Sequence, residues 1–304
     1  GTVDGMPVDD GTVDGTPVYA PLGVLKAGTA FGTFVHGVLE EVDFEASPLE
    51  GAIAESVAKQ ARRTGLDLET LAPAGLNGPQ LLVDGLCAAI HTPLGPLFAG
   101  ASLAQLQRAD RLDELGFDMR IGTEGTHATV RDIGRLVVDH LPDGHLLGPW
   151  ADALAGGSIY VELSGFLTGS IDLVARVHHD DAPDTFVVAD YKTNRLTKRG
   201  STQVTADYRP ERMAEGMVEH HYPLQALLYA AALHRYLRWK LPNSTGPTLV
   251  SGAAYLFVRG MTGPEVAMTG DGLPNGVFTW ELPPGLVVEM SNLLDGRPSR
   301  KAAR

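Results

Sequence analysis

The stretch that decides the fold is GFLTGSIDLVARVHHDDAPDTFVVADYKTN, residues 165–194. Two apolar, β-prone runs flank a polar break that contains Pro183, and this order predicts a strand, a turn and a second strand. Side chains alternate between the two faces of a strand, so Asp190 and Lys192 lie on the same face of the second one. The first strand carries an acid of its own, Asp172, within the otherwise apolar sequence IDLV.

Two acids and a lysine within strands that should belong to the core predict a metal site. Buried charge is costly unless it is compensated, and a cation among the acids would compensate it. Asp172 and Asp190 offer the hard oxygen ligands that suit Mg²⁺ or Mn²⁺. Lys192 can then reach an attacking water or a phosphate oxygen, as phosphodiester hydrolysis requires. The alternative is a buried Asp–Lys pair with a structural role only, because Asp-x-Lys alone is common.

The composition allows a large core and excludes several classes of protein. With 304 residues, of which 44% are hydrophobic, the chain can form one sizeable domain or two. No run is long enough to span a bilayer, and no signal-peptide pattern is present, so no membrane partner is expected. The single cysteine, Cys87, excludes an internal disulfide and a four-cysteine metal site. A reducing, cytoplasmic setting fits this cysteine content.

Charge is unevenly distributed along the chain. The formal net charge of −13 argues against a protein that coats nucleic acid by bulk electrostatics. Residues 1–50 hold nine acids against one lysine, whereas residues 191–240 hold nine Lys or Arg against four acids. The basic segment begins at the predicted site, which favours a local anion track on an acidic body. The alternative is an ordinary solvated face.

Helices predominate before the strand pair, and a mixture of elements follows it. Hydrophobic periodicity predicts one strand and four helices in this part, the strand at 114–121 and the helices at 48–63, 78–91, 103–110 and 128–140. We further expect strands at 158–163, 166–177, 185–191 and 254–258, a polar basic loop over 193–216, a long helix at 221–240 and a short helix from Leu286.

A further helix should start after Gly28, and it carries a histidine, His36, on the edge of its apolar stripe. On spacing alone, a surface pair between His36 and Glu40, one helical turn later, is favoured over a metal ligand. Gly32 and Gly37 indicate that another segment closely approaches the backbone on this side.

Several short motifs, taken in order, resemble one known family. They are GSIDLV, VADYKTN, YPLQALLYAAALHRYL and AYLFVRG, and together they resemble the carboxy-terminal nuclease domain of RecB-type exonuclease V subunits. Upstream, GTFVHG resembles the family's histidine-bearing helix, and ELGFDMRI resembles its Glu-x-x-Phe strand. The matches run from about Gly28 to Gly296. The resemblance implies an α/β fold: a PD-(D/E)XK restriction-endonuclease-like core, with a central mixed sheet flanked by helices and a helical N-terminal subregion.

The resemblance also implies roles for individual residues. The counterparts of His36, Asp172 and Asp190 hold the metal in this family, with the backbone carbonyl of Tyr191 as a further ligand. Lys192 corresponds to the catalytic lysine, beside the catalytic acids Asp172 and Asp190. The resemblance therefore favours a metal-ligand role for His36 over the surface pair with Glu40.

The long helix contributes a further motif to this resemblance. Gln225 and Tyr229 fill the family's Gln-x-x-x-Tyr motif, which is thought to place DNA or support the lysine. Glu114 matches a recurrent acid, for which a structural role is an equal alternative. The implied cofactor is Mg²⁺, with Mn²⁺ or Ca²⁺ able to substitute in binding. The lone Cys87 excludes the branch of the family that holds an iron–sulfur cluster.

The implied function is metal-dependent cleavage of DNA by an exonuclease V-type enzyme with exonuclease and endonuclease action. The expected substrate is single strands produced by a helicase of the same chain, during double-strand-break processing and recombinational repair in the bacterial cytoplasm. RecC- and RecD-like subunits are the expected partners. Two alternatives stay open: an inactive domain that clamps DNA or a subunit, and a stand-alone nuclease of the same superfamily.

The expected domain organisation follows from these matches. Residues 1–22, with the near-duplication GTVDGMPVDD and GTVDGTPVYA, predict an acidic Gly/Pro linker to a preceding domain. Residues 23–296 are expected to form the nuclease domain, mainly helical over 23–157, with its catalytic core at 158–260 and a strand and helix at 261–296. Residues 297–304 form a basic tail.

Overall fold

The computed structural model describes residues 12–13, 16–17, 20–122, 128–159, 161–197, 204–242 and 249–297. Most of the predicted linker and nearly all of the predicted basic tail therefore lie outside the described residues, and the domain boundaries stay predictions. The chain divides into two compact units, each described by itself below. Unit 1 comprises Gly1–Arg108, Tyr191–Met213 and Tyr255–Phe278, and unit 2 comprises Ala109–Asp190, Ala214–Ala254 and Thr279–Arg304.

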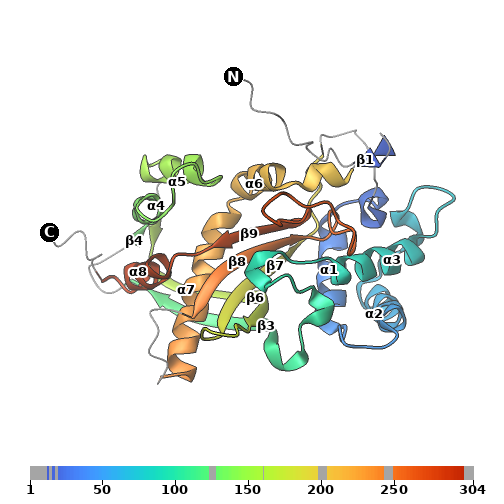
Figure 1. The fold of residues 1–304 in the computed structure, drawn as a ribbon, viewed down its shortest axis with the longest axis horizontal. Helices are drawn as coiled ribbons and strands as arrows, with labels where there is room; N and C mark the ends of the chain where they lie inside the picture. Colours follow the sequence, from blue (N-terminus) through green and yellow to red (C-terminus); the bar gives the residue numbers. More distant parts are fainter. Residues whose placement is uncertain are drawn as a thin grey trace. The chain divides into compact units, whose positions relative to one another are not determined.

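A five-stranded sheet is the central element (Figure 1). Its strands, in spatial order, are β3 (Arg111–Ile121), β6 (Gly165–Val177), β7 (Thr185–Lys192), β8 (Val250–Phe257) and β9 (Val277–Glu281). β3 and β7 both run antiparallel to β6.

The other two strand pairings make the sheet a mixed one. The N–H of Phe186 donates to the carbonyl of Leu249, and the N–H of Val258 donates to that of Lys192. Partner numbers rise together, so β8 is parallel to β7. β9 returns antiparallel to β8, because the N–H of Leu282 donates to Ser251 and that of Phe257 to Gly276. The predicted α/β fold with a central mixed sheet is thereby confirmed.

The strand pair predicted from residues 165–194 has the expected form. β6 and β7 make a hairpin whose turn contains Pro183, and their apolar residues from Ile171 to Ala175 and from Val187 to Ala189 include the most deeply buried of the chain. β3 alternates more strictly, because every second residue from Leu112 to Arg120 is exposed. The sheet therefore presents one partly open face along β3.

Unit 2 contains helices from both sides of the strand pair in the sequence. They are α4 (Val130–Val138), α5 (Gly148–Ala155), α7 (Tyr222–Lys240) and α8 (Pro284–Leu294), with the short pair β4 (Ala128–Thr129) and β5 (Glu162–Leu163). Thr129 caps α4 by accepting a hydrogen bond from the N–H of Asp132. Gly134 lets α4 pack closely on α5, because a Cβ there would overlap the backbone of Leu154.

Unit 1 contains helices, strand ends, irregular segments and the short pair β1 (Thr12–Val13) and β2 (Thr16–Pro17). Its helices are α1 (Thr29–Glu41), α2 (Leu49–Thr64) and α3 (Gly78–His91), and its 3₁₀ turns include η1 (Pro21–Val24), η2 (Glu69–Leu71) and η3 (Pro96–Phe98). Gly65 ends α2 with a left-handed φ of 68°, and Asn77 caps α3 through the N–H of Gln80.

Two predicted elements differ from the structure. The predicted helix at 103–110 is instead two 3₁₀ turns, η4 (Leu103–Gln105) and η5 (Arg108–Asp110). Leu106 adopts an extended conformation that ends the first turn, and propensity alone did not show this break. The predicted strand at 158–163 is reduced to β5, which pairs with β4 outside the central sheet.

Other differences concern short elements with weak periodicity. The basic segment 193–216, predicted to be a loop, contains η6 (Thr205–Tyr208) and the start of α6 (Pro210–Glu219), while its residues 198–203 lie outside the described part. β8 begins at Val250, four residues before the predicted start, and α5 was not predicted, whereas β9 lies within the strand and helix predicted at 261–296. In the described part of the chain, no helix combines the length and the hydropathy needed to cross a bilayer.

Candidate active site

The two predicted acids each lie directly beyond the last pair of the β6–β7 register in unit 2. The last recorded pair of the β6–β7 register joins Leu173 and Ala189. One further step brings Asp172 opposite Asp190, and side chains directly opposite on antiparallel strands share a face with Cβ atoms about 4.5–5.5 Å apart. Asp190 is only 4% exposed, and Asp172 is half-buried. Like charges in this position repel, so the arrangement lowers stability without a cation.

A third carboxylate lies at the same level of the sheet. Glu114 of β3 has a left-handed φ of 53° in the middle of a strand, where a residue with a side chain is strained. The β3–β6 register accordingly passes from Asp113 to Leu115 without pairing Glu114. The hydroxyl of Ser170 donates to Glu114 Oε2 at 3.1 Å and fixes the carboxylate on the face that Asp172 shares. Strain of this kind gathers at functional sites.

Tyr229 of the Gln-x-x-x-Tyr motif is influenced by the charges of all three acids. On α7, Gln225 Nε2 donates to the hydroxyl of Tyr229 at 2.8 Å. Burial raises the pKa of Tyr229 to about 12, and Asp190, Asp172 and Glu114 raise it as well, against the opposing effect of the Gln225 hydrogen bond. The phenol therefore stays protonated. Because its oxygen accepts from Gln225, its own proton is available to a carboxylate or to a phosphate oxygen.

In unit 1, α1 packs against the last residues of β7. The rings of His36 and Tyr191 meet edge to face with centroids 6.0 Å apart. A Cβ at Gly32 would lie 3.1 Å from Thr193 Oγ1, and one at Gly37 would lie 2.9 Å from Gln60 Oε1. The close approaches predicted at both glycines are therefore present. They hold His36 beside Tyr191, the middle residue of the Asp-x-Lys motif.

Lys192 ends β7 two residues after Asp190. Both residues belong to β7, and the period of two predicts that their side chains share one face of the strand. Its ammonium lies 5.2 Å from the ring centroid of Tyr255, a cation–π distance, and its carbonyl accepts from the N–H of Val258 at 3.0 Å. The half-buried Lys192 is thus held by neighbouring strands.

Sequence reasoning missed one residue near this motif, Arg259. It is fully buried, and its guanidinium donates to the carbonyls of Thr193, Leu22, Leu25 and Lys26. The ring of Phe31 lies 4.4 Å from the guanidinium. Burial lowers the pKa of Arg259 to about 10, so the group remains charged at neutral pH. An arginine directly after the apolar strand AYLFV was the signal that could have identified it.

The donors present suit a divalent cation. Paired carboxylates are hard oxygen ligands of the type that Mg²⁺ and Mn²⁺ prefer, and an imidazole and a backbone carbonyl are compatible with either. Within the residues that the structure describes, no three His, Cys, Asp or Glu side chains are already arranged to hold a metal ion. The full ligand set of His36, Asp172, Asp190 and the Tyr191 carbonyl therefore stays a prediction.

Comparison with known proteins connects this geometry to a family. Residues 22–291 match the PD-(D/E)XK nuclease superfamily. This chain belongs to the PD-(D/E)XK nuclease superfamily. The match includes both paired acids, Lys192 and the Gln225–Tyr229 motif, and nucleases of this superfamily generally use divalent metal ions.

The similar proteins carry one shared description, RecBCD enzyme subunit RecB. The chain is 40% identical over 287 residues to that of Mycolicibacterium smegmatis, covering 93% of this chain and 25% of the relative. It is 39% identical over 289 residues to that of Mycobacterium tuberculosis strain H37Rv, covering 92% and 25%. With the Escherichia coli K12 protein it shares 27% identity over 278 residues, covering 90% and 20%.

These matches confirm the predicted resemblance to a RecB-type nuclease domain. The chain spans about a quarter of the length of the two mycobacterial relatives, so the similarity concerns the part that this chain aligns with. Activities and partners of the complete relatives are considered below as proposals.

Proposed function

We propose that this chain is a DNA nuclease that hydrolyses phosphodiester bonds with a bound divalent cation, Mg²⁺, and acts preferentially on single strands. The observation that carries the proposal is the β6–β7 register, which ends at Leu173–Ala189 and whose next step sets Asp172 opposite Asp190, with Lys192 two residues further along β7. Membership of a nuclease superfamily supports the same reaction class.

The residues divide the work between holding the ion and acting on water. Asp172, Asp190, His36 and the Tyr191 carbonyl would hold the cation. When bound, the cation would offset the charge that develops on the phosphodiester. Lys192 orients the attacking water or accepts its proton, from a position that the Tyr255 ring stabilises.

The Gln225–Tyr229 pair supports substrate placement. A phenol with a pKa of about 12 remains a hydrogen-bond donor over the whole physiological range. Gln225 fixes the orientation of this phenol through a 2.8 Å hydrogen bond. The pair thus offers a proton to a phosphate oxygen near the three carboxylates, where an anion would otherwise be repelled.

The assembly in which this nuclease works is also part of the proposal. We infer a helicase in the same longer polypeptide, RecC- and RecD-like partner subunits, and a role in exonuclease V-type processing of DNA breaks in the bacterial cytoplasm. The support is the name RecBCD enzyme subunit RecB, which the similar proteins share.

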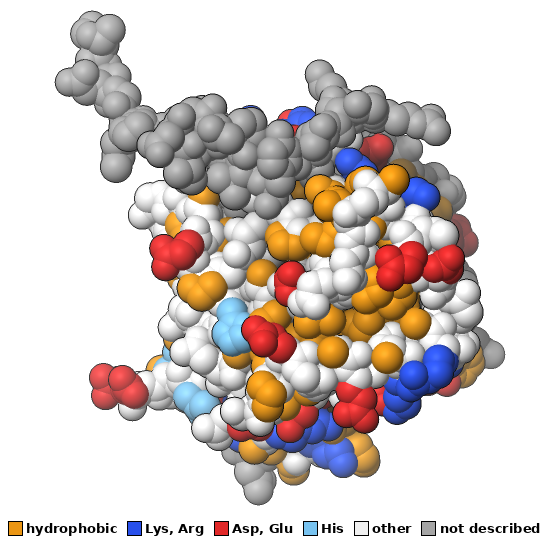
Figure 2. Space-filling view, turned by 90° about the vertical axis from the view of Figure 1, so that its right-hand side faces the viewer, with side chains coloured by type: hydrophobic (Ala, Val, Ile, Leu, Met, Phe, Trp, Pro, Cys, Tyr) orange, Lys and Arg blue, Asp and Glu red, His pale blue; other side chains and the backbone are white. Residues whose placement is uncertain are grey.

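Binding of DNA by this chain should be weak and should depend strongly on salt. The net charge is −13. In Figure 2, acidic side chains surround a hydrophobic area, and Lys and Arg gather at the margins. An acidic protein that contacts phosphates through few cations loses its affinity for DNA rapidly as the salt concentration rises. Tight binding at physiological salt would contradict this part of the proposal.

The decisive experiment compares Asp190→Ala with the wild-type chain on labelled single-stranded DNA, in Mg²⁺, in Mn²⁺ and with a chelator. We expect cleavage by the wild type with either ion, none with the chelator, and a loss of at least about a thousandfold in the variant. Asp152→Ala, at an exposed position of α5, is the matched control and should cleave normally.

Thermal unfolding of Asp190→Ala should occur at or above the wild-type temperature, because the change removes one of two facing like charges. Near-normal cleavage by a folded Asp190→Ala would refute the assignment. A wild-type chain that binds DNA and cleaves it with neither ion would instead support the inactive clamp.

A further inference from the structure

The open face of β3 and β6 continues well beyond the acids. On this face the register pairs Asp118 with Thr168, and then Arg120 with Phe166. The hydroxyl of Thr168 donates to Asp118 at 3.3 Å. Arg120 is six residues after Glu114, and at 3.3 Å per residue the two levels of the sheet are about 20 Å apart. An exposed strip thus runs from the three carboxylates to the Arg120–Phe166 pair.

Phe166 is an unusual residue for the far end of such a strip. Its side chain is 75% exposed, the highest value among the large hydrophobic residues of the described chain. A single exposed apolar side chain is common in itself. This one lies directly opposite an arginine, on the same sheet face as the catalytic acids, so its ring is open to a planar ligand.

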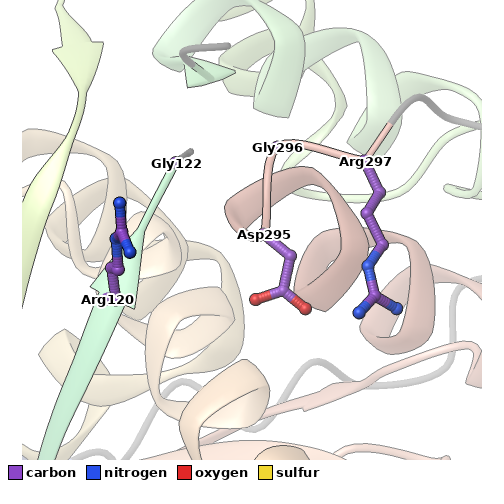
Figure 3. A pocket seen from close by; sticks show the side chains of 5 residues that line it. All are labelled: Arg120, Gly122, Asp295, Gly296 and Arg297. Carbon is purple, nitrogen blue, oxygen red and sulfur yellow. The ribbon is translucent and has the colours of Figure 1, made fainter. Parts of the chain in front are cut away.

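A pocket adjoins the Arg120 end of the strip. It has a volume of about 340 Å³ and is lined by Arg120, Gly122, Asp295, Gly296 and Arg297. In Figure 3, the side chain of Asp295 lies between those of Arg120, at the end of β3, and Arg297, which follows α8. Two guanidinium groups therefore flank one opening, and all of these residues belong to unit 2.

The carboxylate of this pocket is already neutralised. Arg235 of α7 forms an ion pair with Asp295 Oδ1 at 2.7 Å and also donates to the carbonyls of Arg120 and Ser291. For Arg120 and Arg297, by contrast, no carboxylate partner occurs among the residues that the structure describes. Two cations near a compensated acid leave the pocket with a net positive charge.

The cations also crowd one another. Burial lowers the pKa of Arg235, and the neighbouring charges of Arg238 and Arg297 lower it further, while Asp295 opposes them. Like charges held close together without an anion reduce stability, and an anion bound between them would relieve the repulsion. Guanidinium groups bind phosphate by paired hydrogen bonds, which suits a ligand with several oxygens.

We propose that Arg120, Arg297 and Phe166 form a binding subsite for single-stranded nucleic acid, with a backbone phosphate between the guanidinium groups and a base stacked on the Phe166 ring. The subsite rests on the proposed nuclease function, because it lies on the strip that leads to the carboxylates. A base must leave a duplex to stack on a side chain, so the subsite selects single strands.

The first test measures binding without cleavage. Fluorescence anisotropy with a labelled oligothymidylate, in a chelator, compares the 304-residue chain with the Arg120→Glu/Arg297→Glu double variant. Arg62→Glu/Arg63→Glu, at exposed positions of α2, makes the same change in net charge and is the control. We expect at least about tenfold weaker binding than in the control, and a salt slope smaller by about 0.7, since the contact with one phosphate of a single strand is lost.

The second test concerns stacking. Phe166→Leu keeps an apolar side chain but removes the π-face, and it should weaken binding about fivefold or more, whereas Phe166→Tyr should bind like the wild type. Trp239→Leu, at an aromatic position that is 71% exposed on α7, is the control and should not change affinity.

The outcomes separate this subsite from the nuclease proposal. Binding by the double variant within twofold of its charge-matched control, or equal binding by Phe166→Leu and Phe166→Tyr, would overturn the subsite. That result would also arise if the face bound a protein instead. A wild-type chain that cleaves no DNA would remove the nuclease proposal, while the binding comparison in a chelator would still decide the subsite.

Discussion

Two clusters of charge in this molecule are stabilised in opposite ways. In unit 1, the buried guanidinium of Arg259 is surrounded by backbone carbonyls that accept its hydrogen bonds. In unit 2, the carboxylates of Asp172 and Asp190 face each other across two strands, and Glu114 adds a third acid on strained backbone. The Arg259 guanidinium is therefore compensated by carbonyls of its own chain, whereas each of the acids lies beside another negative charge.

This difference distinguishes a charged residue with a structural role from charged residues that bind a ligand. Arg259 ties Leu22, Leu25 and Lys26 to Thr193, next to Lys192, so it positions the end of β7 within unit 1. A guanidinium whose hydrogen bonds are all accepted by backbone carbonyls does not require a ligand. Like charges held together on a rigid sheet gain stability when a counter-ion binds, and such an arrangement persists where binding is the purpose.

The largest effect is expected at Lys192. A variant at this position shows whether its ammonium has a structural role, as Arg259 does, or a chemical role, as we propose for the acids. If it acts on water, Lys192→Met should slow cleavage of single-stranded DNA about a thousandfold. The free energy of unfolding should change by less than about 1 kcal/mol, since the ammonium is only half-buried. Lys59→Met on α2 is the control for loss of one positive charge. A stable protein with unchanged cleavage would assign Lys192 to structure.

Arg259 should show the reverse pattern. Arg259→Met removes the guanidinium donor from four carbonyls, of which those of Leu22 and Leu25 are buried, so we expect a loss of about 3–5 kcal/mol in the free energy of unfolding, measured with denaturant. Arg259→Lys keeps the charge but not the planar set of donors, and its free energy of unfolding should lie between those of the wild type and Arg259→Met. A loss below about 1 kcal/mol for Arg259→Met would show that the guanidinium does not hold this region.

Glu114 tests whether the acid cluster is strained. At a φ of 53°, Glu114→Gly should be more stable than Glu114→Ala by about 1 kcal/mol, because only glycine adopts this conformation without cost. Both variants lose the carboxylate, so the difference reports on the backbone alone. At Asp118, an ordinary strand position, the alanine variant should be the more stable one. The same order at both positions would remove the strain from the account.

The smallest effect is expected at a surface cluster, where charges are balanced but exposed. His178 contacts Asp184 and Asp110 at 3.0 and 2.9 Å, and these contacts raise the pKa of His178. Burial alone would raise the pKa of Asp110, but hydrogen bonds from Arg176 and His178 lower it instead.

The raised pKa of His178 contributes stability below about pH 6.5, and this contribution is lost as the pH rises through the folded-state value. The lowered pKa of Asp110 contributes above about pH 4 and is lost toward lower pH. His178→Gln should therefore lower the melting temperature more at pH 5.5 than at pH 9. His179→Gln, whose ring contacts the Thr185 hydroxyl, should show no such difference.

Local sequence patterns predicted the elements that carry the acids and missed contacts between distant segments. The alternation in β6 and β7, the glycines of α1 and the Gln225–Tyr229 spacing all depend on residues a few positions apart, and these features are present. The cross-strand register that brings Asp172 opposite Asp190 also follows from the hairpin, once the turn is located.

Features that depend on tertiary context could not be read in this way. The left-handed Glu114 lies in a regular strand pattern, and nothing in ELGFDMRI marks it. Arg259 joins segments more than 200 residues apart, and the Arg120–Arg297 pocket joins the end of β3 to the end of α8. Weakly periodic stretches such as residues 103–110 fold into short turns because neighbouring segments, rather than propensity, determine their conformation.

The most direct test of the account is a calorimetric titration of Mn²⁺ into the 304-residue chain without DNA, repeated with Asp172→Asn and Asp190→Asn, and with Asp152→Asn as the control. If the facing carboxylates hold a cation, the wild type and the control will bind Mn²⁺ saturably, and each of the other two variants will bind it at least about tenfold more weakly. Equal Mn²⁺ binding by all four proteins would contradict the claim that Asp172 and Asp190 form the metal site.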